Sequence, residues 1–153
     1  MPISTDNFVD DFVLNTSKIF EDNRSSLGLK EVFRDDVVIV SQVPSLAVSC
    51  TSMYNTVRTL GSTNVRYEFL FIGELWYYHS SISPDVTPNL VMSNAYRLTK
   101  HILQNASLNG WLTNTRALVR SCNYSVRPRS QNLFASARIM VLAPYQTRIA
   151  NIS

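Results

Sequence analysis

Apolar residues near the N-terminus recur with the period of an α-helix. Their spacings of three and four residues produce one face that is apolar apart from a threonine, formed by Phe8, Val9, Phe12, Val13, Thr16, Ile19 and Phe20. Ser4 or Thr5 can cap the start of this helix, and Asp6 complements the helix dipole there. We therefore predict an amphipathic helix whose apolar face covers the core and which ends at residues 23–28, where the stop signals lie.

A second segment with helical spacing begins at Thr87, which is followed by Pro88. Threonine at the N-cap and proline at the first helical position are both favoured at helix starts. One stripe of the segment is apolar and comprises Val91, Ala95, Leu98 and Ile102. Cations follow in its second half, where they suit the dipole. We predict a helix from Pro88 to about residue 105.

The strongest strand signal covers residues 64–79, where one face is aromatic and aliphatic and the other mixes charged with apolar residues. Sixteen extended residues would span about 50 Å, whereas a domain of this size has a radius of gyration of about 15 Å. The strand must therefore bend, break or project, and Gly73 is a natural site for a bend or bulge. If it projects, Trp76, Tyr77 and Tyr78 need another chain to cover them. A bent strand wholly inside one sheet is the alternative.

Further strand patterns surround this one. Two short runs, 37–40 and 46–51, flank Pro44, and two longer runs cover 115–126 and 132–142, with Pro144 expected to end the last one. The turn at 127–130 joins the longer runs into a hairpin. Residues 52–63, which include Tyr54 and Arg58, are predicted to form a long connection of the kind that often carries function.

The order of these elements is helix, several strands, helix and hairpin. This order predicts an α+β fold, in which an N-terminal helix and a second helix pack on a mainly antiparallel β-sheet that a β-hairpin closes. No repeat or low-complexity tract divides the chain, so we predict a single domain over residues 1–153.

Charge is sparse and unevenly placed. Charged residues make up 16% of the chain, below the average of about 25%, which argues against disorder. Residues 1–40 contain four Lys/Arg and eight Asp/Glu (net −4), and residues 41–153 contain ten and three (net +7). The arginines form no block, and we favour their pairing with acidic groups of the same subunit or the next one. Tyr124, Arg127, Arg129 and Phe134 nevertheless have a composition that could bind nucleic acid by stacking and charge.

Residues suited to catalysis or metal binding are isolated in this sequence. Its four glycines begin no phosphate-binding loop. His79, His101, Cys50 and Cys122 show none of the spacings typical of metal sites. The carboxylates fall in adjacent pairs or far apart along a strand, which does not suit acid–base catalysis. We therefore expect no enzyme activity, no cofactor and no metal.

The cellular compartment of the protein is inferred from its N-terminal residues and from the lengths of its apolar runs. The N-terminal residues are polar and acidic, with no secretory apolar segment, and no apolar run approaches the length of a membrane span. We expect no membrane association, and we expect synthesis in a cytoplasm with both cysteines reduced and buried.

The assembled layout resembles that of a known family. A proline precedes a short strand at residues 43–49 (VPSLAVS), and an Arg-Tyr-rich strand follows at 66–72 (RYEFLFI). A helix ends in the LQNA of residues 103–106, the LNGW of 108–111 comes next, and an arginine-bearing hairpin completes the chain. This layout is similar to tail terminator and related minor tail proteins of long-tailed bacteriophages. The likeness covers nearly the whole chain and lies in order and size, without a diagnostic motif.

The resemblance implies a structural role in a virion. Such proteins form hexameric rings on the last ring of the tail tube, stop its polymerisation and present a surface to the connector of the head. DNA passes through the lumen without being read. The resemblance thus implies a homo-oligomer at the head–tail junction, assembled in the host cytoplasm, with the tail tube protein and a head-side connector or stopper as partners.

A ring requires an interface that closes by rotation, and aromatic side chains and arginines are common in interfaces. We predict contact residues in the aromatic strand, the hairpin and the loops at 52–63, 80–87 and 127–130: Tyr54, Arg58, Trp76, Tyr77, Tyr78, Arg127 and Arg129. The interpretation depends on these side chains facing other chains. Alternatives are a stopper, an adaptor or a tube subunit, a small basic nucleic-acid-binding domain, and a small enzyme with a pocket between helix and sheet.

Overall fold

A computed structural model gives the backbone of residues 1–59 and 66–148, with side chains described for 1–55 and 67–147. Its elements along the chain are α1 (Phe8–Glu21), β1 (Glu31–Phe33), β2 (Ser45–Thr59), β3 (Arg66–Ser81), α2 (Pro88–Gln104), β4 (Leu118–Arg129) and β5 (Asn132–Arg148). The strands form one sheet in the order β1-β2-β3-β5-β4. Only β1 pairs in parallel, with β2, and the other pairings described are antiparallel. The predicted α+β fold, with an N-terminal helix, a second helix and a closing hairpin, is confirmed.

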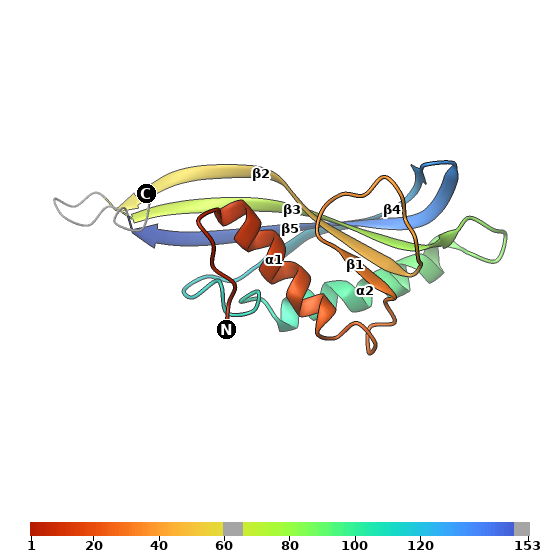
Figure 1. Cartoon of the computed structure of the whole chain (residues 1–153), viewed down its shortest axis with the longest axis horizontal. Helices are drawn as coiled ribbons and strands as arrows, with labels where there is room; N and C mark the ends of the chain where they lie inside the picture. Colours follow the sequence, from red (N-terminus) through yellow and green to blue (C-terminus); the bar gives the residue numbers. More distant parts are fainter. Residues whose placement is uncertain (60–65, 149–153) are drawn as a thin grey trace.

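Both helices cover the same face of the sheet (Figure 1). Their apolar stripes meet alternate residues of the central strands and form the main core, which includes Phe12, Phe20, Val91, Leu98, Phe71, Leu75, Ile139 and Val141. The helix starts are set by side chains that accept backbone N–H groups: Asn7 caps α1 and Thr87 caps α2. Thr5, one of the expected caps, instead binds Asp11.

The long strand β3 remains inside the sheet and does not project. It pairs with β2 on one side and with β5 on the other along nearly its whole length. The sheet as a whole is elongated (Figure 1), which accommodates the sixteen-residue strand. The bulge expected at Gly73 lies instead on the neighbouring strand, where Thr51 is left out of the pairing between Cys50↔Gly73 and Ser52↔Ile72. Gly73 serves a different purpose, because the ring of Phe12 packs directly over it.

Three local predictions are wrong. Residues 37–40 form no strand but belong to the loop that joins β1 to β2. The expected long connection at 52–63 continues β2 as far as Thr59. Pro144 does not end the last strand, since β5 runs to Arg148. Pro144 lies beyond Leu142, the last residue that pairs with β4, so one side of β5 has the edge character that tolerates proline.

The loop of residues 34–44 covers a second, smaller core on the face of the sheet opposite the helices. There Trp76 and Tyr78 pack with Ala47 and Phe134, and the loop contributes Val37, Val40 and Val43. Of the run that suggested a strand, Val37 and Val40 pack on this core, whereas Val38 and Ile39 are exposed. In Figure 1 this loop is the orange segment that arches between β1 and β2.

Candidate functional site

The three aromatic residues predicted as contacts are buried within the chain. Trp76 is 9% exposed, Tyr77 4% and Tyr78 0%. Tyr77 faces the helices in the main core, where its hydroxyl hydrogen-bonds His79 Nδ1 at 2.9 Å. Trp76 and Tyr78 lie under the loop of residues 34–44. The expectation that they face other chains is wrong, because a strand paired on both sides carries its side chains into the two cores of its own sheet.

The hairpin arginines are also engaged within the chain. Arg127 and Arg129 both bind the carboxylate of Asp36, at 2.9 and 3.1 Å, and both donate to the Tyr78 hydroxyl, at 2.8 and 3.2 Å. The Arg127 guanidinium lies 3.9 Å from the centroid of the Trp76 ring, a cation–π arrangement. We name Asp36, Trp76, Tyr78, Arg127 and Arg129 the clasp. The two arginines were predicted as contacts to another chain, and the structure instead places both within the chain, where they hold the loop of residues 34–44 on the sheet.

The electrostatics of the clasp follow from its burial. Desolvation raises the pKa of Tyr78, and the nearby positive charge of Arg129 partly opposes this rise. The phenol is therefore neutral at physiological pH, and its oxygen can accept from both arginines. Asp36 belongs to an adjacent pair of carboxylates, Asp35-Asp36, whose arrangement did not suit acid–base catalysis. Its partners lie more than ninety residues away, and the local sequence pattern gave no signal of them.

The remaining predicted contacts differ in their exposure. Tyr54 lies on β2 and is 58% exposed, so it is available to a partner. The side chain of Arg58 lies outside the described residues. The residues of the loop between β3 and α2 are mostly exposed, with Ile82 at 46%. The loop predicted at 127–130 is shorter, since β4 extends to Arg129 and the turn occupies residues 130–131.

Both outer edges of the sheet are open among the described residues. On one side, β1 pairs only with residues 45–47 of β2, so the edge beyond Ala47 has no strand beside it. On the other side, β4 pairs with β5 alone. The β2 edge has two register shifts, at Thr51 and at residue 58, and the β4 edge has one, at Arg120. Open edges present unpaired backbone groups that can bind another chain, and bulges limit indiscriminate pairing there.

The sheet face opposite the helices is only partly covered. Leu70, Ile72, Met140 and Leu142 lie on this face beyond the smaller core and are half-buried. Glu74 and Arg138 approach to 4.0 Å between them. The face therefore combines apolar area with a loose ion pair, a composition compatible with contact to another protein surface.

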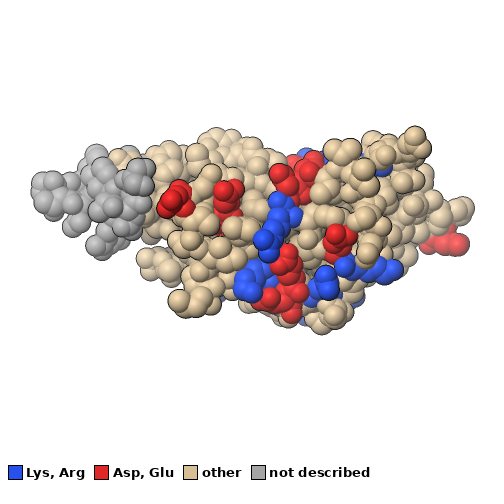
Figure 2. Space-filling view, in the orientation of Figure 1, with Lys and Arg blue, Asp and Glu red and all other residues tan. Residues whose placement is uncertain are grey.

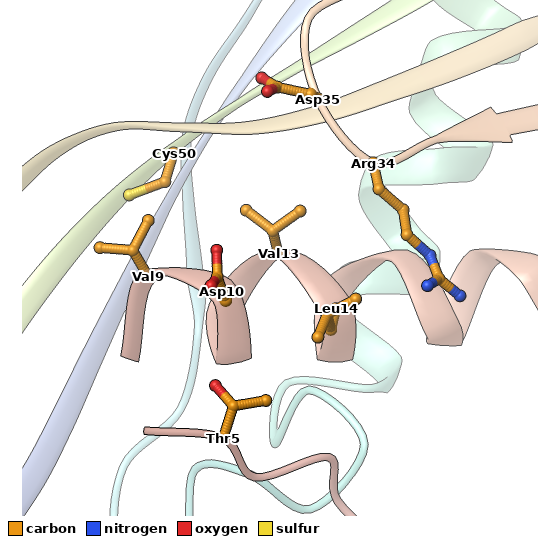
Figure 3. Close-up of a pocket in the computed structure, with 8 residues that line it drawn as sticks. All are labelled: Thr5, Val9, Asp10, Val13, Leu14, Arg34, Asp35 and Cys50. Carbon is orange, nitrogen blue, oxygen red and sulfur yellow. The ribbon is translucent and has the colours of Figure 1, made fainter. Parts of the chain in front are cut away.

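A groove lies between α1 and the open edge of β2 (Figure 3). It has a volume of about 290 Å³, and its lining is more apolar than polar, through Val9, Val13, Leu14 and Cys50 together with Thr5, Asp10, Arg34 and Asp35. Figure 3 shows Val9 and Val13 pointing from the helix toward β2, with Cys50 directed at Val9 and Asp35 above them. Burial raises the pKa of the Cys50 thiol, so this cysteine is a weak nucleophile.

The chemically reactive residue types are dispersed. Within the described residues there is no group of three His, Cys, Asp or Glu side chains that could hold a metal ion. His101 hydrogen-bonds the carbonyl of Ile19 at 2.7 Å and so links the two helices. Cys50 and Cys122 are free thiols on different strands. None of the described helices is long and apolar enough to cross a membrane.

Several arginines pair with carboxylates of the same chain, which is one of the two arrangements expected from their scattered placement. Arg34 binds Glu21, Arg138 approaches Glu74, and the two clasp arginines share Asp36.

No family model matches this sequence, and a search of curated proteins finds no match either.

Proposed function

We propose that this chain is a structural subunit that assembles with copies of itself into a ring at the head–tail junction of a bacteriophage. The observation that carries the proposal is the pair of open edges, along β2 and along β4, on opposite sides of one sheet. A subunit with two different contact surfaces on opposite sides can join head to tail, and such a chain closes into a ring when the rotation per subunit permits.

The partly covered sheet face supports the same proposal. Half-buried aliphatic residues lie on it beside the exposed Tyr54. Apolar area of this kind on a small domain is typical of surfaces that contact other proteins. The proposal no longer depends on the aromatic strand and the arginine hairpin, because the clasp occupies them internally. It depends on the edges and on this face.

The detailed role comes from the resemblance in layout. In this proposal the ring has six subunits, contacts the tail tube on one side and a head-side connector or stopper on the other, and lets DNA pass without reading it. A stopper, an adaptor and a tube subunit would use similar surfaces. They differ in how the assembly ends, since a tube subunit continues into filaments.

Electron microscopy and native mass spectrometry of the purified protein test the proposal. A closed ring of six subunits is the expected result. Open filaments would favour a tube subunit, and a chain that stays monomeric at high concentration would contradict self-assembly. Binding of duplex DNA that weakens steeply with salt would instead favour a nucleic-acid-binding domain.

A further inference from the structure

The groove beside β2 carries acidic groups without a cationic partner. Asp10 has no ion pair among the described residues, and the Asp35 carboxylate accepts only the neighbouring backbone N–H of Asp36, at 2.7 Å. Arg34, the cation in the lining, is bound to Glu21 at 3.2 Å. In Figure 2 acidic and basic groups lie side by side across the middle of this face, and the charged groups to the left of that band are acidic.

The opposite edge of the sheet has the complementary charge. Arg116 lies two residues before β4, and Arg120 is the third residue of that strand. Both side chains are exposed, and neither has a carboxylate partner among the described residues. Between them, Leu118 is 57% exposed. The edge thus presents one aliphatic side chain between two arginines, and the groove presents aliphatic side chains between two aspartates.

We propose that the β4 edge of one copy docks on the groove and open β2 edge of the next copy. Arg116 and Arg120 then face Asp10 and Asp35, and Leu118 contacts the apolar lining at Val9 or Val13. This inference rests on the proposed function and names the surfaces that would join the subunits. Charge complementarity of this kind sets the choice of partner and the orientation of docking.

The bulges on both edges agree with contact through side chains. Thr51 and Arg120 interrupt the regular pattern of backbone groups, so a long ladder between the two edges is disfavoured. Side-chain charge then decides which edges meet. Two copies of the same surface repel each other. A groove docked on a groove brings aspartates together, and a β4 edge docked on a β4 edge brings arginines together. Only the head-to-tail arrangement brings opposite charges together, and this is the arrangement that a ring requires.

Charge reversal on each surface tests the inference. One variant combines Asp10→Lys with Asp35→Lys, and the other combines Arg116→Glu with Arg120→Glu. Each alone is expected to stay folded by circular dichroism and to associate on the order of 100-fold more weakly than wild type, measured by sedimentation velocity at low salt. Mixed in equal amounts, the two are expected to co-assemble in a 1:1 ratio, seen by native mass spectrometry. Asp85→Lys, on the exposed loop before α2, adds two positive charges away from the groove and so shows the effect of half the net-charge change of the aspartate variant.

The outcomes separate the two proposals. Wild type that assembles, together with reversed variants that assemble equally well, overturns this interface and leaves the ring intact. Variants that fail alone and also fail when mixed overturn the interface too, because complementary charge should restore it. Wild type that stays monomeric overturns the interface and the ring together.

Discussion

The ring of Phe12 occupies the space that a side chain on residue 73 would fill. A Cβ built on Gly73 would lie 2.7 Å from Phe12 Cε1 and closer still to Cζ. Phe12 is fully buried and packs against Phe71 and Trp111, so it has little room to move away. Glycine at this position allows α1 to approach the centre of the sheet closely.

Gly73→Ala is therefore expected to destabilise the protein by about 1–3 kcal/mol through overpacking. Urea unfolding measures the change. The double variant Gly73→Ala with Phe12→Leu should show coupling, with a smaller loss than the sum of the two single changes. Additive losses would show that the two residues do not compete for this space.

The clasp gives a second prediction. Asp36→Asn removes the charge that two arginines share, and the loop of residues 34–44 is expected to loosen over Trp76. Because the Asp36 side chain is 44% exposed, the loss is expected to be only about 1 kcal/mol, and it should shrink in high salt. Unfolding followed by tryptophan fluorescence at two salt concentrations measures both effects. Asp35→Asn alters the neighbouring carboxylate, which has no ion pair within the part of the chain that the structure describes, and should change stability by less than about 0.5 kcal/mol. Equal losses for the two variants would contradict the clasp.

Tyr77 predicts how stability responds to alkaline pH. Burial raises the pKa of this phenol from 10.0 to about 12. Above pH 10 the unfolded chain loses this proton while the folded protein keeps it, so the contribution is complete below pH 10 and is lost as the pH rises toward 12. Tyr77→Phe should flatten the fall in unfolding free energy over that window, relative to wild type. A comparison at pH 8 gives the separate cost of the lost hydrogen bond to His79. An unchanged alkaline slope in Tyr77→Phe would show that this phenol is not responsible.

Asn15 ties the N-terminal segment to α1 and gives a fourth prediction. This buried side chain exchanges hydrogen bonds with the backbone of Ile3, both at 2.7 Å, and donates to the carbonyl of Asp11. Asn15→Ala should cost about 1–3 kcal/mol because backbone groups lose their partner. It should also speed hydrogen exchange at the amide of Ile3. Asn94 makes the same bond to the carbonyl four residues before it, but at the surface. Asn94→Ala should therefore lower the free energy of unfolding far less than Asn15→Ala. Equal losses for the two variants would show that the bonds of Asn15 to Ile3 add nothing to the bond within the helix.

Sequence periodicity predicted much of this fold because it reports which face of an element is buried. The stripe from Val91 to Ile102 predicted α2, and the alternation around Phe71 predicted β3 to within a few residues. Periodicity failed where burial came from a distant segment. Residues 37–40 resemble a strand, although they lie in a loop from which Val37 and Val40 pack on the cluster that contains Trp76 and Tyr78.

The candidate site was harder to predict for the same reason. Trp76, Tyr78, Arg127 and Arg129 were predicted to contact other chains, and the structure places their partners in the same chain. Asp36 is separated from the arginines by about ninety residues, and no local pattern links them. The open edges likewise depend on which strands become neighbours, which topology decides.

The order of strands has a consequence for how the molecule comes into being. β5 is the last of the described strands to be synthesised, yet it lies between β3 and β4. The apolar stripe of α2 packs against β4 and β5, so part of the surface that buries it is missing until residues 132–148 have been synthesised. Before β5 is synthesised, a growing chain on the ribosome would therefore leave apolar side chains of α2, β3 and β4 exposed to solvent. Shortening the chain before β5 would leave β1, β2 and β3 as one sheet and separate β4 from it.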